Sequence, residues 1–160
     1  MKILANVIIV LILVVGCSNE SQYEKESPIG HSWILTEIAV NGGELVSIPR
    51  YANFFWSFKE KPYNFDDTST NAYIEGDHWC NWFYVFINIA EAGITFSPFT
   101  LFTPMSCSYL EEDGVLLNIV ETKILSLHTN GNVEYEIIDD FMSLYTEDGT
   151  TLVFQRVRSE

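Results

Sequence analysis

Apolar and polar residues alternate along much of this chain, and alternation with a period of two is typical of a strand with one buried face. Within 51–59, for example, Phe54, Trp56 and Phe58 are predicted to lie on one face of a strand. Turn sequences rich in Asn and Gly separate such stretches. In the first two thirds of the chain, the predicted strands are 31–38, 51–59, 82–89 and 93–96, with a loop over 61–71.

The pattern changes in the last third of the chain. Apolar residues recur there at spacings of three and four, which predicts one amphipathic helix. Its predicted apolar face consists of Leu116, Ile119, Val120, Ile124 and Leu127. Asn130-Gly131 is expected to end this helix, and Asp148-Gly149 to form a hairpin turn. The strands predicted after the helix are 133–137, 141–146 and a last one around Leu152 and Phe154.

These elements predict a fold that is mainly β with one helix. Residues 30–158 are enough for one domain with a real core, and no internal repeat or second linker divides them. About seven short strands favour a curled antiparallel sheet or a partly open β-barrel, a shape that removes exposed strand edges.

The N-terminus has the pattern of an export signal. Lys2 precedes an apolar run over 3–15, which is too short for a comfortable membrane span of about 20 residues. The run ends at Val14-Val15-Gly16-Cys17, which resembles the bacterial lipobox, where the signal is cut before a diacylated Cys. We therefore expect 1–16 to be a lipoprotein signal peptide and Cys17 the lipid attachment site; the alternative is a plain secretory signal with an incidental Cys.

Residues 17–29 are predicted to be the lipidated Cys and a flexible tether, because they are polar and carry no apolar pattern. Acyl chains on Cys17 would hold the protein on a membrane of the cell envelope, since two or more chains anchor stably. Ser18 resembles the residue that sorts lipoproteins to the outer membrane, facing the periplasm, in cells with two membranes. The net charge of −14 makes nucleic acid an improbable partner but names no ligand.

Two further cysteines, Cys80 and Cys107, are predicted to form a disulfide, because the expected compartment lies outside the cytoplasm. Closing a loop of about 27 residues would stabilise the fold by roughly 3.5 kcal/mol on the chain-entropy model. The alternatives are a zinc site or a reactive thiol. No CxxC pair supports them, and only His78 is close in sequence.

Four short motifs occur in an order that resembles the META domain (HslJ-like) family. They are Gly30-x-x-Trp33-x-Leu35-x-x-Ile38, Cys80-Asn81-x-Phe83, Ile94-Thr95-Phe96 and Thr103-Pro104-Met105-Ser106-Cys107, followed by a helix, a strand and Leu152-x-Phe154. The resemblance covers nearly the whole chain after the signal. The chain departs from the family pattern at Asp77-His78-Trp79 and Tyr84-Val85-Phe86, where members usually have Gly, so the local turn there is expected to differ.

The resemblance implies a small β-rich envelope domain associated with stress tolerance and without established enzyme chemistry, so no catalytic residues are carried over. The motifs in the sequence also favour a protein that is not an enzyme. The sequence contains no nucleophile elbow, phosphate-binding loop, zinc-protease motif or EF-hand, and no cofactor or metal is expected. His31, His78 and His128 are far apart in sequence, and His78 is expected to be a polar surface residue.

Aromatic residues concentrate in the segment HWCNWFYVF, residues 78–86. Packing in the core and across strands explains most of them, but one face could line a pocket or an exposed contact patch. Trp79, Trp82 and Tyr84 are the candidate contacts with a ligand or partner. The sequence thus supports a lipid-anchored envelope lipoprotein with a binding or envelope-stress support role. The alternative is a lipocalin-like carrier of a small apolar ligand, which large aromatics in the interior would oppose.

Overall fold

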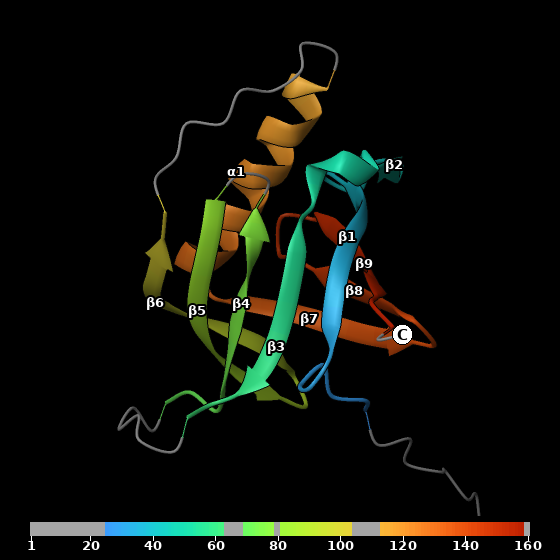
Figure 1. Cartoon of the computed structure of the whole chain (residues 1–160). Helices are drawn as coiled ribbons and strands as arrows, with labels where there is room; N and C mark the ends of the chain where they lie inside the picture. The colour runs from blue at the N-terminus through green and yellow to red at the C-terminus, as the bar shows by residue number, and fades with distance from the viewer. Residues whose placement is uncertain (1–24, 63–68, 79–80, 104–112, 159–160) are drawn as a thin grey trace, which may run out of the picture.

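Eight antiparallel strands close into a β-barrel in the computed structural model, which describes residues 25–62, 69–78, 81–103 and 113–158. In Figure 1, β1, β3, β4 and β5 stand at the front and β7–β9 cross behind them. Pairing of β1 with β9 closes the barrel, and the short β2 adds to β1 outside it. The strands are β1 (Ser32–Ala39), β2 (Val46–Ser47), β3 (Phe55–Glu60), β4 (Ala72–His78), β5 (Asn81–Ala90), β6 (Gly93–Phe102), β7 (Asn132–Ile138), β8 (Phe141–Tyr145) and β9 (Thr151–Arg156).

The predicted fold class is confirmed: the chain is mainly β with one helix and forms a barrel. Several details differ from the sequence prediction. The barrel is closed and has eight strands where about seven were expected, and β4 was not predicted. The start of the predicted strand over 51–59 is instead the short 3-10 helix η1 (Arg50–Ala52), and β6 continues beyond residue 96 to Phe102.

Large apolar side chains fill the inside of the barrel. Trp56 is fully buried at the centre, with its ring 4.8 Å from the ring of Phe154 and 5.8 Å from that of Phe83. Trp56 and Phe58 share the inward face of β3, and Phe54, directly before the strand, is also buried, as the alternation predicted. The indole N–H groups of Trp33 and Trp56 have no hydrogen-bond acceptor among the described residues.

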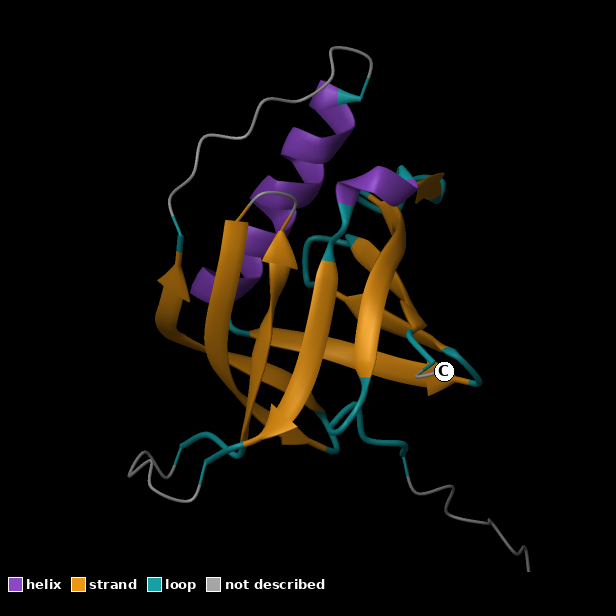
Figure 2. Ribbon diagram, viewed as in Figure 1, coloured by secondary structure: helices purple, strands orange, loops and turns teal. Residues whose placement is uncertain are grey.

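The helix α1 (Gly114–Asn130) covers one end of the barrel (Figure 2). Leu117, Val120, Ile124 and Leu127 are buried and join the barrel core, whereas Ile119, predicted to lie on the buried face, is half exposed. At its C-terminus, Gly131 has a positive φ of 87° and donates its N–H to the carbonyl of Leu127. The predicted end of the helix is therefore correct. In the parts of the chain that the structure describes, no helix has the length and hydropathy needed to cross a membrane.

The N-terminal residues of the described chain form a strap against the barrel, which we define as residues 25–29. The ammonium of Lys25 lies 3.9 Å from the ring centroid of Tyr135 and donates to the carbonyl of Glu91 at 3.2 Å. Glu26 pairs with Arg156, Pro28 is buried, and Ile29 packs against the core. The sequence placed these residues in a free tether, but the structure shows them in contact with the barrel.

Candidate functional site

An exposed aromatic face lies on the outside of the barrel, over β4, β5 and β6. Alternation along β5 points Phe83, Val85 and Ile87 into the core and leaves the side chains between them outside. Trp82 is 43% exposed and Leu101, opposite Tyr84 on β6, is 60% exposed. The members of this aromatic face are Tyr73 of β4, Trp82, Tyr84 and Phe86 of β5, and Leu101 of β6.

The rings of this face pack against one another as cross-strand and same-strand neighbours. Tyr73 and Tyr84 are stacked, with centroids 4.7 Å apart and an angle of 28° between the rings. Tyr84 also lies 6.3 Å from Trp82 and meets Phe86 edge to face at 5.0 Å. Such pairs stabilise a sheet by about 0.5–1.5 kcal/mol beyond the area they bury. The face is therefore an ordered surface rather than a set of separate side chains.

Two charged residues beside the face are Lys59 of β3 and Glu75 of β4. Their side chains form a hydrogen-bonded ion pair, and the hydrogen bond to Glu75 raises the pKa of Lys59. Burial, helped by Tyr73 and Glu75, raises the pKa of Tyr84, so its phenol stays neutral and can donate a hydrogen bond at neutral pH.

A carboxylate lies at one end of the face. Asp77 of β4 is the cross-strand partner of Trp82 on one side and of Phe55 on the other. Directly opposite side chains on one side of an antiparallel sheet are about 5 Å apart at Cβ, so the carboxylate has an aromatic neighbour on each side. Asp77 is half-buried, and within the described part of the chain no cation pairs with it. This register places a hydrogen-bond acceptor between two aromatic residues.

Of the predicted site residues, the structure brings Trp82 and Tyr84 together on the aromatic face. Trp79, the lipid-attachment residue Cys17 and the predicted disulfide partners Cys80 and Cys107 lie outside the described residues. Their roles therefore stay predictions.

Sequence reasoning missed Tyr73, Asp77 and Leu101, because β4 and the second half of β6 were not recognised as strands. The alternation of Tyr73, Glu75 and Asp77 with Ala72 and Ile74 was the signal that could have found β4.

The expectation that His78 is a surface residue is wrong. Its side chain is fully buried and stacks on Phe83, with ring centroids 4.0 Å apart. The cause is register: His78 follows Ala72, Ile74 and Gly76 on the inward side of β4. The ring contacts place His78 in the aromatic core, with Phe54 and Trp56 also near it.

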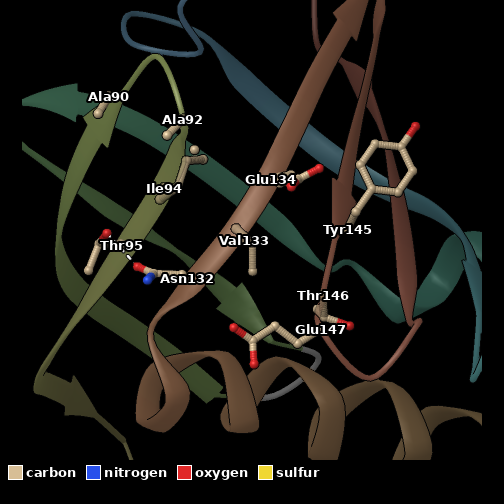
Figure 3. A pocket seen from close by; sticks show the side chains of 11 residues that line it. Ala90, Ala92, Ile94, Thr95, Asn132, Val133, Glu134, Tyr145, Thr146 and Glu147 are labelled. Carbon is tan, nitrogen blue, oxygen red and sulfur yellow. Dashed lines mark hydrogen bonds between the residues drawn. The ribbon is translucent and has the colours of Figure 1, made fainter.

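A groove of about 420 Å³ with a mixed polar and apolar lining opens on another side of the barrel, between the β5–β6 turn, β7 and β8 (Figure 3). Thr95 and Asn132 point toward each other across it, and the Thr95 hydroxyl donates to Asn132 Oδ1 at 2.6 Å. Glu134 and Glu147 add carboxylates, and Tyr145 stands at the rim. Of the hydroxyls at this groove, that of Thr95 is paired with Asn132 and that of Tyr145 with Glu136.

A second groove of about 470 Å³ continues from the first toward α1 and shares Asn132, Val133, Thr146 and Glu147 with it. Lys123 of α1 pairs with Asp148 of the β8–β9 turn at 2.5 Å across this groove. Hydrogen bonds from Lys123, Thr146 and Thr150 hold the pKa of Asp148 well below its usual range. The carboxylate and its cation satisfy each other, which makes this groove a structural contact between helix and turn.

No metal centre is found among the described residues, since no three of their His, Cys, Asp and Glu side chains come close enough to hold an ion. His31 lies 4.0 Å from Glu26 of the strap, and His78 is in the core. The candidate site that the described residues offer is the aromatic face.

Solved structures share this barrel. An NMR structure of a protein from Burkholderia xenovorans superimposes with a TM-score of 0.59 at 17% identity, over 82% of this chain and 85% of that one. A second NMR structure does so with a TM-score of 0.53 at 21% identity, over 78% and 87%. At these identities the likeness establishes the fold alone. No known family model matches the chain, and no curated protein sequence matches it significantly.

Proposed function

We propose that this chain is a lipid-anchored lipoprotein of the cell envelope that binds a protein partner through its aromatic face and catalyses no reaction. The observation that carries the proposal is the distribution of aromatic side chains. The barrel interior is filled by rings that are fully buried, such as Trp56 and Phe154, while Trp82 remains 43% exposed on the outside. Trp and Tyr are enriched at the centres of protein interfaces because they bury much area and keep a polar group.

The anchor rests on the sequence. The apolar run ending at Gly16-Cys17 supports diacylation of Cys17, and the META-like motifs support a role in envelope stress. A protein of net charge −14 would be repelled by anionic lipid headgroups. Acyl chains would overcome this repulsion, since each buried methylene contributes about 0.8 kcal/mol.

A carrier of a small apolar ligand is the second candidate. Eight strands is a barrel size that can enclose one small ligand. The indole N–H groups of Trp33 and Trp56, which have no acceptor among the described residues, would be satisfied by a ligand with a carbonyl or ether oxygen. Against this stands the packing of the interior, where Trp56 contacts Phe83, Phe154 and their neighbours directly.

Site-specific photocross-linking in intact cells tests the partner proposal. A benzophenone amino acid replaces Phe86, on the aromatic face, or Phe141, an exposed Phe of β8 that serves as the matched control. We expect position 86 to give one discrete protein adduct that position 141 does not give, and Trp82→Ala to reduce it. Identical adduct patterns from the two positions, or no adduct from position 86, would contradict the proposal.

The anchor is tested in the same cells by fractionation. Cys17→Ala should move the protein from the membrane to the soluble fraction and remove its incorporation of a labelled fatty acid. Membrane association that persists without the label would show that Cys17 does not carry the anchor.

A further inference from the structure

The carboxylate of Asp77 differs from its neighbour Glu75 in one respect. Glu75 is neutralised by Lys59 of the next strand, whereas no cation pairs with Asp77 within the described residues. A half-buried carboxylate without a cation is only partly hydrated, and a partner that supplies the cation regains that lost interaction. Asp77 is therefore the place on the aromatic face where an incoming charge would contribute most.

The two cross-strand neighbours of Asp77 indicate which kind of cationic group would fit beside it. Trp82 and Phe55 lie on either side of it in the register of the sheet. An aromatic ring attracts a cation over its face, and Trp does so best. A planar guanidinium can stack on a ring and donate two parallel hydrogen bonds to one carboxylate, which an ammonium cannot do.

We propose that the aromatic face binds an arginine-containing segment of a partner protein, with the guanidinium on Asp77 beside Trp82 and apolar residues of the segment on Tyr84, Phe86 and Leu101. This inference rests on the proposed function and names the class of partner. The chain as a whole supports it, because 22 acidic and 8 basic residues attract a basic partner and disfavour a second copy of the same chain.

A peptide titration followed by NMR tests the proposal on the folded protein that begins at Ser18. The probes are acetyl-Leu-Arg-Leu-Arg-Leu-amide and the same peptide with citrulline in place of arginine, which keeps the shape and removes the charge. We expect the arginine peptide to shift the Trp82 indole signal in a saturable way, and to bind at least about fivefold more tightly than the citrulline peptide.

Two matched substitutions assign the effect to the site. Asp77→Asn should lower the affinity for the arginine peptide to that of the citrulline peptide. Glu134→Gln, which removes an equal charge from an exposed position on β7, should leave it unchanged. If Asp77→Asn does not fold, Trp82→Leu replaces it in the test. This variant keeps an apolar side chain at an exposed position and should weaken binding of the arginine peptide.

Equal binding of the two peptides, absence of saturable binding, or an equal effect of Glu134→Gln and Asp77→Asn would overturn the arginine proposal. The cross-link from position 86 distinguishes this failure from failure of the proposed function. If position 86 gives a protein adduct but the arginine peptide binds no more tightly than the citrulline peptide, the proposed function would stand and the partner would contact the face through other residues than arginine.

Discussion

At the residue scale, Gly76 shows that the packing of the barrel depends on the absence of a side chain at one position. A Cβ at this position would overlap the carbonyl oxygen of Phe55 and come within 2.9 Å of the Phe83 ring. The three strands β3, β4 and β5 can pack as they do only because β4 has no side chain here. Gly76 also lies on the inward side of β4, where its neighbours Ile74 and His78 bury their side chains.

We predict that Gly76→Ala lowers the free energy of unfolding by about 2–3 kcal/mol, because the neighbour that must move is backbone. Gly131→Ala is the control: its Cβ would meet nothing within 4 Å, but its φ of 87° is unfavourable for alanine. That variant should lose only about 1 kcal/mol. Urea unfolding measures both, and a smaller loss for Gly76→Ala than for Gly131→Ala would show that β4 can shift away.

Single residues were predicted well where alternation was regular and poorly where it was interrupted. Trp56 and Phe58 alternate with the polar residues Ser57 and Lys59, so their common face could be predicted. In β4, a glycine and a histidine take inward positions that usually hold large apolar residues. Alternation therefore gave only a partial signal for this strand, from Ala72 and Ile74, and Asp77 was not recognised as part of the candidate site.

At the element scale, α1 is held to the barrel by one buried row of side chains. Leu117, Val120, Ile124 and Leu127 join the core at spacings of three and four, while Val115 is 73% exposed. The helix was predicted because this spacing is visible in sequence. The burial of Leu117 was not predicted. Leu116 and Leu117 are adjacent, and the angle at which the helix packs on the barrel determines which of them is fully buried.

Leu117→Ala should lower the free energy of unfolding by about 3 kcal/mol, since it leaves a cavity between helix and barrel. Val115→Ala, two positions earlier on the exposed side, should change it by less than about 0.5 kcal/mol. Chemical denaturation followed by tryptophan fluorescence and by far-UV circular dichroism checks both. Similar losses for the two variants would mean that α1 does not dock through this row.

For the whole molecule, closure depends on pairs that are far apart in sequence. Leu35 of β1 pairs with Phe154 of β9, and the register shifts between Leu35 and Glu37. Neither the partner of an edge strand nor such a bulge follows from alternation, which says only which side of a strand is buried. This is why the sequence left open whether the barrel closes, although it predicted most of its strands.

Because the inside of the barrel is filled by side chains, we predict that the purified protein carries no bound small molecule. Native mass spectrometry of the chain from Ser18, exported and purified without lipid, should give the bare polypeptide mass. The packing of Trp56 against Phe83 and Phe154 is the physical reason. A mass two hydrogens lower would add evidence for the predicted Cys80–Cys107 disulfide. A releasable small molecule bound in stoichiometric amount would instead support the carrier function.

The strap limits how far from a membrane the anchored barrel could lie. The described chain begins at Lys25, beside Tyr135 and the β5–β6 turn, at the end of the barrel opposite the start of α1 (Figure 1). A lipid on Cys17 is eight residues earlier, a reach of at most about 29 Å. An acyl anchor at Cys17 would therefore keep the end of the barrel that carries the strap within this distance of the bilayer, so a partner bound to the aromatic face would itself lie close to the membrane surface.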